Sequence, residues 1–235
     1  MDTNILFTDI VGYSKLTGDD QSLALELLNE HDKIIEPIIL RHDGRILKRI
    51  GDAIVAIFDK TENMIQTSIE IQQSLKNRNN RNIKSRHIVL RIGLHYGDII
   101  IKDHEVYGSG YDIASEIEPI CEYGGIAISD SVYLQSHENG KYIINGVKNN
   151  FFINPIANFN FKSSANPILV YKLYLNLLDW YDEPYLDTAN YLMDQHVNSN
   201  RYDINIPNKF SKKDLNNRLD IGQSFLDKHN LSYAI

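Results

Sequence analysis

The stretch from Gly44 to Phe58, GRILKRIGDAIVAIF, constrains the fold more than any other part of the chain. Apolar and polar residues alternate in its first half, and residues 53–58 are almost entirely apolar. Alternation is typical of a half-buried strand, and a short apolar run is typical of a buried one. Gly51 and Asp52 between the two runs indicate a tight turn, because glycine accepts a positive φ without steric penalty. The pattern predicts a hairpin that holds the Asp52 carboxylate at a rigid tip, with Lys48 shortly before it.

The rest of the chain predicts alternating strands and helices. Strands are expected at 4–10, 87–101 with a break at 96–98, 126–129 and 168–175, and helices from Asp19 or Asp20 to a kink or stop at Pro37, at 62–75, 108–122 and 130–136. Loops are expected at 76–86 and 149–161. This order predicts an α+β fold with helices on one face of a mainly antiparallel sheet. The residue pattern of 176–235 differs from that of the preceding segment, and short helices are expected near 186–196 and 211–229.

Composition narrows the function. The 235 residues carry a formal net charge of -7, which argues against a nucleic-acid partner, because such binding needs a basic face. The single cysteine, Cys121, excludes an intrachain disulfide and fits a reducing compartment. No apolar run approaches the ~20 residues of a membrane span. We therefore expect a cytoplasmic protein with no membrane contact.

Two acids are placed where they can meet. Asp9 ends the first predicted strand, and Asp52 lies on the hairpin turn. If these strands are neighbours, the two carboxylates converge at one end of the sheet, and such a pair favours Mg²⁺ or Mn²⁺. Backbone N–H groups of the loop at 11–14, which leads into a helix, suit phosphate binding. The residues alone therefore predict metal-dependent chemistry on a nucleoside triphosphate.

Four stretches together resemble a known family. They are FTDIVGYS at 7–14, KRIGDA at 48–53, RIGLHYG at 91–97 and YGSGYDIASE at 107–116. Their order and spacing resemble the catalytic domain of class III nucleotidyl cyclases over roughly residues 3–175. The resemblance implies a ferredoxin-like cyclase homology domain at 1–175, followed by a small helical extension at 176–235.

The resemblance also implies a mechanism. Asp9, Asp52 and the backbone carbonyl of Ile10 would bind two Mg²⁺ or Mn²⁺ ions per site. The ribose 3′-oxygen would attack the α-phosphorus of a nucleoside triphosphate, with pyrophosphate as the leaving group. Members of this family act as homodimers with sites at the subunit interface, and their cyclic nucleotide would act on a downstream effector.

Further positions are assigned by the same resemblance. The implied nucleotide-binding residues are Phe7, Val11, Gly12, Tyr13, Ser14, Lys48, Glu105 and Lys162. Lys48 and Glu105 fall at the base-selecting positions, and a lysine with an acidic partner resembles adenine selection. Lys162 lies near the phosphate-binding lysine of the family.

The chain departs from the family at two catalytic positions. Asp112 and Glu116 stand where the family has an asparagine that orients the ribose and an arginine that stabilises charge on the α-phosphate. Loss of one preorganised donor costs on the order of 10² to 10³ in rate, and reversal of the charge should cost more. Arg49, Lys162 or a residue of 176–235 would have to compensate.

Three interpretations stay open. The first is an active cyclase with an altered site, for example a stand-alone pyrimidine cyclase that uses UTP or CTP in bacterial anti-phage signalling, which the free-standing architecture resembles. The second is an adenylyl cyclase that makes cyclic AMP, favoured by Lys48 and Glu105. The third is a catalytically degenerate homologue that binds nucleotide or regulates a partner, favoured by Asp112 and Glu116.

Overall fold

The computed structural model describes residues 2–102, 105–138, 141–142, 152–174 and 203–205. The chain divides into two compact units, residues 1–204 and 205–235. Apart from Asn205, the second unit lies outside the described residues, and so do the helices predicted near 186–196 and 211–229. The predicted boundary at residue 175 therefore stays a prediction. Within the described part of the chain, no helix is both long and apolar enough to cross a membrane.

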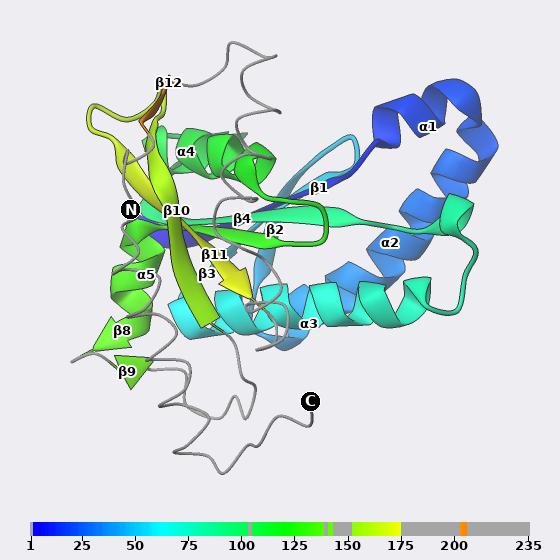
Figure 1. Cartoon of the computed structure of the whole chain (residues 1–235), viewed down its shortest axis with the longest axis horizontal. Helices are drawn as coiled ribbons and strands as arrows, with labels where there is room; N and C mark the ends of the chain where they lie inside the picture. Colours follow the sequence, from blue (N-terminus) through cyan, green and yellow to red (C-terminus); the bar gives the residue numbers. More distant parts are fainter. Residues whose placement is uncertain (1, 103–104, 139–140, 143–151, 175–202, 206–235) are drawn as a thin grey trace, which may run out of the picture. The chain divides into compact units, whose positions relative to one another are not determined.

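Strands and helices alternate along the chain (Figure 1). The strands are β1 (Asp2–Ile10), β2 (Arg45–Ile50), β3 (Ala53–Phe58), β4 (Leu90–Asp98), β5 (Ile100–Lys102), β6 (Glu105–Tyr107), β7 (Ile126–Ser129), β8 (His137–Glu138), β9 (Lys141–Tyr142), β10 (Phe152–Asn160), β11 (Ile168–Tyr174) and β12 (Asp203–Asn205). The α-helices are α1 (Tyr13–Asp19), α2 (Gln21–Arg41), α3 (Thr61–Asn79), α4 (Ser109–Ile117) and α5 (Asp130–Ser136). Two 3-10 turns, η1 (Lys84–Arg86) and η2 (Glu118–Ile120), complete the set in the described residues.

One sheet organises the domain. Its strand order is β12-β10-β11-β7-β4-β1-β3-β2. The β4–β7 pair is parallel, while β1 pairs antiparallel with both β3 and β4. The predicted hairpin of β2 and β3 is present, with Gly51 at a φ of 62° in its turn. The structure confirms the predicted α+β fold with a mainly antiparallel sheet.

Helices cover both faces of this sheet, so the expectation of one covered face is wrong. Leu6 of β1 packs in a large core with Ile35 of α2 and Ile65 of α3. Phe7 points to the other face and packs in a smaller core with Ala114 of α4. Figure 1 shows α4 on the opposite side of the sheet from α2 and α3. Successive strand residues point to opposite faces, and β1 and β3 are apolar at both sets of positions, so each face needs its own cover.

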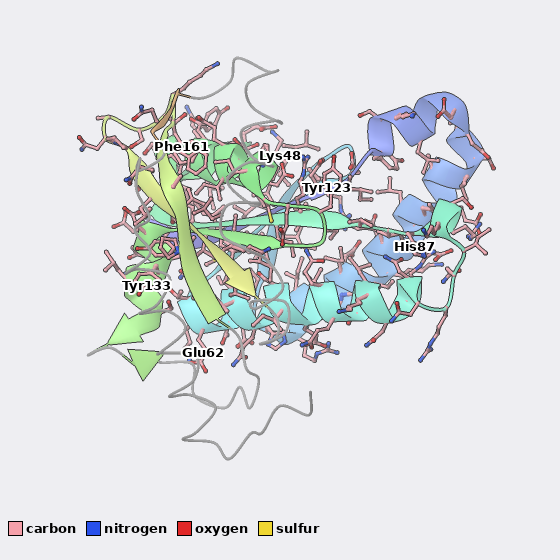
Figure 2. All side chains as sticks on the ribbon, in the orientation of Figure 1. Lys48, Glu62, His87, Tyr123, Tyr133 and Phe161 are labelled. Atoms are coloured by element: carbon pink, nitrogen blue, oxygen red, sulfur yellow. The ribbon has the colours of Figure 1, made fainter. Side chains whose placement is uncertain are left out.

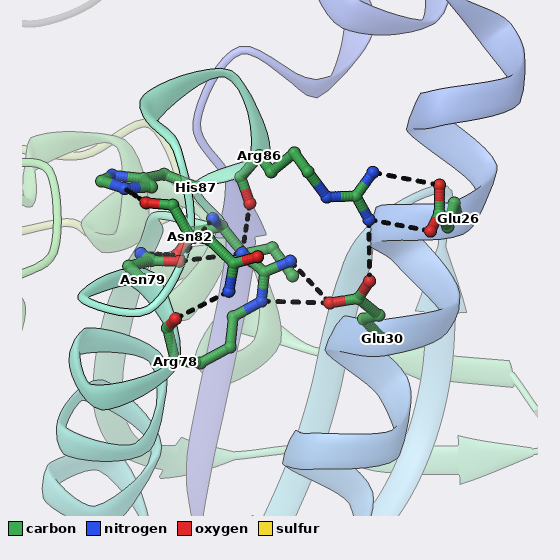
Figure 3. Close-up of polar contacts among 8 residues, drawn as sticks. Glu26, Glu30, Arg78, Asn79, Asn82, Arg86 and His87 are labelled. Atoms are coloured by element: carbon green, nitrogen blue, oxygen red, sulfur yellow. Dashed lines mark hydrogen bonds and ion pairs between the residues drawn. The ribbon is translucent and has the colours of Figure 1, made fainter.

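Charged side chains tie α2 to the end of α3 (Figure 3). Arg86 donates to Glu26 Oε1 at 2.8 Å and to Glu30 Oε1 at 3.0 Å. Arg78 Nε donates to Glu30 Oε2 at 3.1 Å. Asn79 Nδ2 also donates to the carbonyl of Ile88 at 2.8 Å. The network holds the last turn of α3 in a segment whose composition predicted a solvated loop.

Other element boundaries also differ from the expectation. The helix α2 begins after the predicted cap Asp20, whose carboxylate accepts from the N–H of Leu23, but it runs through Pro37 to Arg41. The helix α4 ends at Ile117, because Pro119 has no N–H to donate to the carbonyl of Ser115 and cannot continue the helical hydrogen bonds.

Two strand predictions need correction as well. The strand β4 runs unbroken through 96–98, because these residues pair with residues 2–4 of β1. Residues 152–160, expected to lie in a loop, form β10 and pair with β11. In both cases a partner strand far away in the sequence supplies the backbone hydrogen bonds that local composition does not predict.

Two glycines let α4 approach β4 closely. A Cβ at Gly110 would lie 2.8 Å from the carbonyl carbon of Gly97, and a Cβ at Gly97 would lie 3.2 Å from the Cα of Gly110. The first distance is too short for a carbon–carbon contact, and the second is shorter than most such contacts. The pair therefore sets the position of α4, which carries Asp112 and Glu116, against the sheet.

Candidate active site

Asp9 and Asp52 meet at the end of β1. The antiparallel pairing of β1 with β3 places Thr8 opposite Ile54, so the turn before β3 lies beside the last residues of β1. The N–H of Ile10 donates to Asp52 Oδ2 at 2.9 Å. The strands that carry the two acids are thus neighbours, which is the condition under which the sequence predicted that the carboxylates converge.

Electrostatics at this pair favour a cation. Burial and the charge of Asp9 raise the pKa of Asp52 to about 6, although the N–H of Ile10 opposes the shift. The repulsion that Asp9 exerts on the Asp52 carboxylate is relieved by a divalent ion as well as by a proton. No cluster of three or more His, Cys, Asp or Glu side chains suited to a metal occurs in the described residues. Any metal here would therefore need the two aspartates, backbone oxygen, substrate or water as ligands.

Arg91 and Glu118 extend this site, and the sequence analysis assigned them no role. Arg91 lies directly opposite Asp9 in the β1–β4 register and donates to Asp9 Oδ2 at 2.8 Å. Its Nε lies 2.6 Å from Glu118 Oε1, an ion pair whose two atoms lack hydrogen-bond geometry. The Glu118 side chain is 5% exposed, and burial raises its pKa to about 8 although Arg91 opposes the shift. Arg91 thus contacts two acidic side chains at once.

Part of the loop at 11–14, which the sequence predicted to bind phosphate, already makes a backbone hydrogen bond within the fold. The N–H of Val11 donates to the carbonyl of Val89 at 2.8 Å. Gly12 has a φ of 76° and precedes α1, whose first turn holds Tyr13 and the exposed Ser14. Tyr13 also packs against the large core. The backbone of Gly12 to Ser14 is therefore a better candidate for phosphate contact than that of Val11.

Lys48 and Glu105 form an ion pair between β2 and β6. Their side chains are 33% and 50% exposed, so the pair faces solvent. Lys48 lies close to α4 (Figure 2). Burial raises the pKa of Tyr111 on this helix, although the charge of Lys48 opposes the shift. The ring of Tyr111 packs against Phe7 with centroids 6.1 Å apart. The two predicted base-selecting residues are thus in contact, beside a small aromatic pair.

The two departures from the family lie on α4 in different settings. Asp112 is exposed in the first turn of the helix. Glu116 accepts the N–H of Lys162 at 2.9 Å and the hydroxyl of Ser163 at 2.8 Å. The Glu116 carboxylate therefore binds the turn that carries Lys162.

Arg49, which the sequence suggested as a compensating cation, instead forms ion pairs with two acids of α2. Its Nη1 lies 3.0 Å from Asp32 Oδ2, and its Nη2 pairs with Glu36, both on α2. These contacts hold the β2 backbone against α2. Of the two compensating cations that the sequence named individually, Lys162 is left.

The protein is thus an α+β domain in which two aspartates lie together beside a β-hairpin turn. Such a pair of oxygen donors suits a divalent cation, which in turn can bind phosphate. Residues 2–154 match the family model for the adenylate and guanylate cyclase catalytic domain. Because this match covers more than half of the chain, the protein belongs to that family.

Individual relatives agree with this assignment. The chain is 35% identical over 134 residues to a putative adenylate cyclase 3 of Rhizobium meliloti, covering 57% of this chain and 23% of that protein. It is 31% identical over 147 residues to an adenylate cyclase of Anabaena cylindrica, covering 54% and 29%. A solved adenylate/guanylate cyclase/hydrolase of Silicibacter pomeroyi superposes with a TM-score of 0.63 at 28% identity, covering 73% of this chain and 95% of that structure. The chain spans less than a third of the length of these two sequence relatives.

Proposed function

We propose that this protein is a nucleotidyl cyclase, a phosphorus–oxygen lyase that converts a nucleoside triphosphate into a 3′,5′-cyclic nucleotide and pyrophosphate. One observation carries the proposal: Asp9 and Asp52 converge at the end of β1 in a domain of the cyclase family. In the reaction, the ribose 3′-oxygen forms a bond to the α-phosphorus and the bond to pyrophosphate breaks. The hydroxyl proton passes to solvent.

The residues at this site fit the divalent ions that the family implies. Asp52 is half-buried beside a second carboxylate, and hard oxygen donors are the ligands that Mg²⁺ and Mn²⁺ prefer. Asp9, Asp52 and the backbone carbonyl of Ile10 would hold two such ions. Bound ions would lower the pKa of the ribose 3′-hydroxyl and neutralise phosphate charge. Arg91 donates a hydrogen bond to Asp9 Oδ2 and so orients this carboxylate at the end of β1.

The remaining site residues would bind the substrate. Lys162 would contact the phosphates as a cation, and Lys48 with Glu105 would contact the base. The site residues form three groups of contacts: Asp9 with Asp52, Lys48 with Glu105, and Glu116 with Lys162. We expect two copies of the chain to join these groups across a homodimer interface. A cytoplasmic location would supply the triphosphate and the metal.

The Lys48–Glu105 contact favours adenine, because a lysine and a carboxylate can pair with the ring N1 and the 6-amino group. A pyrimidine cyclase of an anti-phage system, with a downstream effector of cyclic UMP or cyclic CMP, is the alternative. The exposed Asp112, in place of a ribose-orienting asparagine, favours a third candidate, a nucleotide-binding homologue without turnover.

A four-substrate assay separates these candidates. Purified full-length protein is incubated with Mn²⁺ and ATP, GTP, CTP or UTP in turn, and 3′,5′-cyclic products are identified by mass spectrometry. Cyclic AMP as the main product supports the adenylyl assignment, and product from UTP or CTP alone supports the pyrimidine one. Nucleotide binding with no cyclic product from any of the four would contradict the cyclase proposal.

The base contacts give a prediction about selectivity. Lys48→Ala and Glu105→Ala should each raise KM for the preferred triphosphate about tenfold, because one base hydrogen bond is worth roughly 1 kcal/mol or more. Thermal stability should change little, because exposed ion pairs contribute about 0–1 kcal/mol. KM for all four triphosphates and the melting temperature are measured. The matched control is Arg41→Ala, which removes an exposed ion pair with Glu70 on the helices and should leave KM unchanged. Unaltered KM values in the Lys48 and Glu105 variants would contradict the assignment.

The raised pKa of Asp52 predicts proton release when metal binds. Near pH 6 this carboxyl is about half-protonated without metal, so Mn²⁺ binding should displace roughly half a proton from it. The difference from an Asp52→Asn variant should be about half a proton at pH 6 and fall towards pH 8, where Asp52 is already ionised. Calorimetric titration with Mn²⁺ in two buffers of different ionisation enthalpy measures the release. A difference that does not vary with pH would contradict the proposed pKa.

A further inference from the structure

Glu116 bridges two elements that are distant in the sequence. It lies near the end of α4, and the residues that it contacts lie between β10 and β11. One carboxylate oxygen accepts the backbone N–H of Lys162 at 2.9 Å, and the other accepts the hydroxyl of Ser163 at 2.8 Å. Both oxygens of the carboxylate therefore contact the same short turn.

Hydrogen bonds and a buried side chain fix the conformation of this turn. The N–H of Ser164 donates to the carbonyl of Phe161 at 3.2 Å, which closes the turn on Lys162 and Ser163. Phe161, labelled in Figure 2, is 3% exposed and stacks on Phe159 with ring centroids 5.9 Å apart. One end of the turn is thus anchored in the core, and Glu116 holds its tip. The Lys162 side chain stays exposed.

The chemistry of these contacts explains why an acid stands at residue 116. Both partners are donors, a backbone N–H and a hydroxyl hydrogen, so the residue on α4 must be an acceptor. An arginine offers five N–H donors and no acceptor, so it could make neither contact. A carboxylate accepts both, and hydrogen bonds to an ionised group are stronger than neutral ones.

We propose that Glu116 is a positioning residue that holds the turn at 161–164, so that the Lys162 ammonium is presented to the phosphates of the substrate. The inference rests on the proposed function, in which Lys162 binds phosphate. Glu116 then acts through Lys162 and does not face the triphosphate itself. The carboxylate that stands in place of the family's arginine would thus contribute to the phosphate site by positioning Lys162.

The test is a double-variant cycle read out by binding of inorganic pyrophosphate. Calorimetry with Mg²⁺ present measures its Kd for the full chain, with Glu116→Ala, Lys162→Ala and both changes together. We expect each single change to weaken binding about tenfold, and the double variant to be no weaker than Lys162→Ala alone, because linked residues are not additive. Ser163→Ala, which removes one donor and preserves the carboxylate, should weaken binding about threefold. Ser115→Ala, a change on α4 whose hydroxyl donates to the Asp112 carbonyl, is the matched control and should bind normally.

Several outcomes would overturn the inference. Additive losses in the double variant would show that Glu116 does not act through Lys162. Tighter binding by Glu116→Arg would show that Glu116 is merely an anion in the place of a phosphate-binding arginine. Absence of pyrophosphate binding by the unaltered chain would remove the role of Lys162. If Glu116→Ala does not fold, Ser163→Ala and its double variant with Lys162→Ala decide the same question. If the pyrophosphate measurements come out as expected but the protein turns over no triphosphate, the proposed cyclase activity is contradicted and the role of Glu116 is not.

Discussion

Asp52→Ala should lower the rate of cyclic-nucleotide formation by at least about 10³-fold, because bound metal supplies several kcal/mol of transition-state stabilisation. The carboxylate accepts the N–H of Ile10 and lies beside Asp9, so alanine removes a proposed metal ligand and a contact that joins the turn to β1. Asp9→Ala should have a similar effect. The rate is measured with saturating triphosphate and Mn²⁺, and the melting temperature reports whether the fold survives.

A second aspartate beside the same strand provides the control. Asp59 follows β3 directly and is exposed, whereas Asp52 directly precedes it. Asp59→Ala removes the same group from the opposite end of β3 and should leave turnover unchanged. Full turnover by folded Asp52→Ala and Asp9→Ala proteins would contradict the proposed metal site.

Arg91→Ala should destabilise the protein by about 3 kcal/mol at pH 9, above the pKa of Glu118, because removal of one partner then leaves a buried carboxylate uncompensated. Glu118 is 4% exposed, and Arg91 contacts both Glu118 and Asp9. For a chain of this size the loss corresponds to a fall in Tm of roughly 6–12 °C. Equilibrium unfolding in urea at pH 9 measures the change in free energy.

A compensating variant tests the cause of this loss. Arg91→Ala combined with Glu118→Leu removes the buried charge together with its partner, and should recover most of the lost stability. Turnover should be low in both variants, since Asp9 lacks its cation in each. A double variant as unstable as Arg91→Ala, or less stable, would show that the Arg91 contacts other than the ion pair dominate.

Local sequence patterns predicted where Asp9 and Asp52 lie on their own elements, and predicted their meeting on the condition that the two strands are neighbours. A strand that ends in an acid and a Gly-Asp turn between two apolar runs each have a short-range signal. Their meeting requires only that β1 and β3 be neighbours, which two β-rich segments of one small sheet favour. The Lys48–Glu105 contact was accessible through the family resemblance, because each residue lies within or near a quoted motif.

Other parts of the site had no local signal. Arg91 opens a motif that the sequence analysis quoted, but its pairing with Glu118 depends on η2, which brings that acid beneath the sheet. The Glu116 anchor depends on a turn that follows a strand expected to be a loop. Such contacts are decided by tertiary packing between distant segments, and neither periodicity nor residue spacing encodes them.

The central claim is that Asp9 and Asp52 hold divalent ions over a triphosphate. Crystals grown with Mn²⁺ and a non-hydrolysable triphosphate analogue test it directly, because anomalous scattering locates the manganese. We expect manganese peaks within coordination distance of both carboxylates, with the analogue's phosphate oxygens completing the coordination. Manganese bound elsewhere, or analogue bound with no manganese at either aspartate, would contradict the claim.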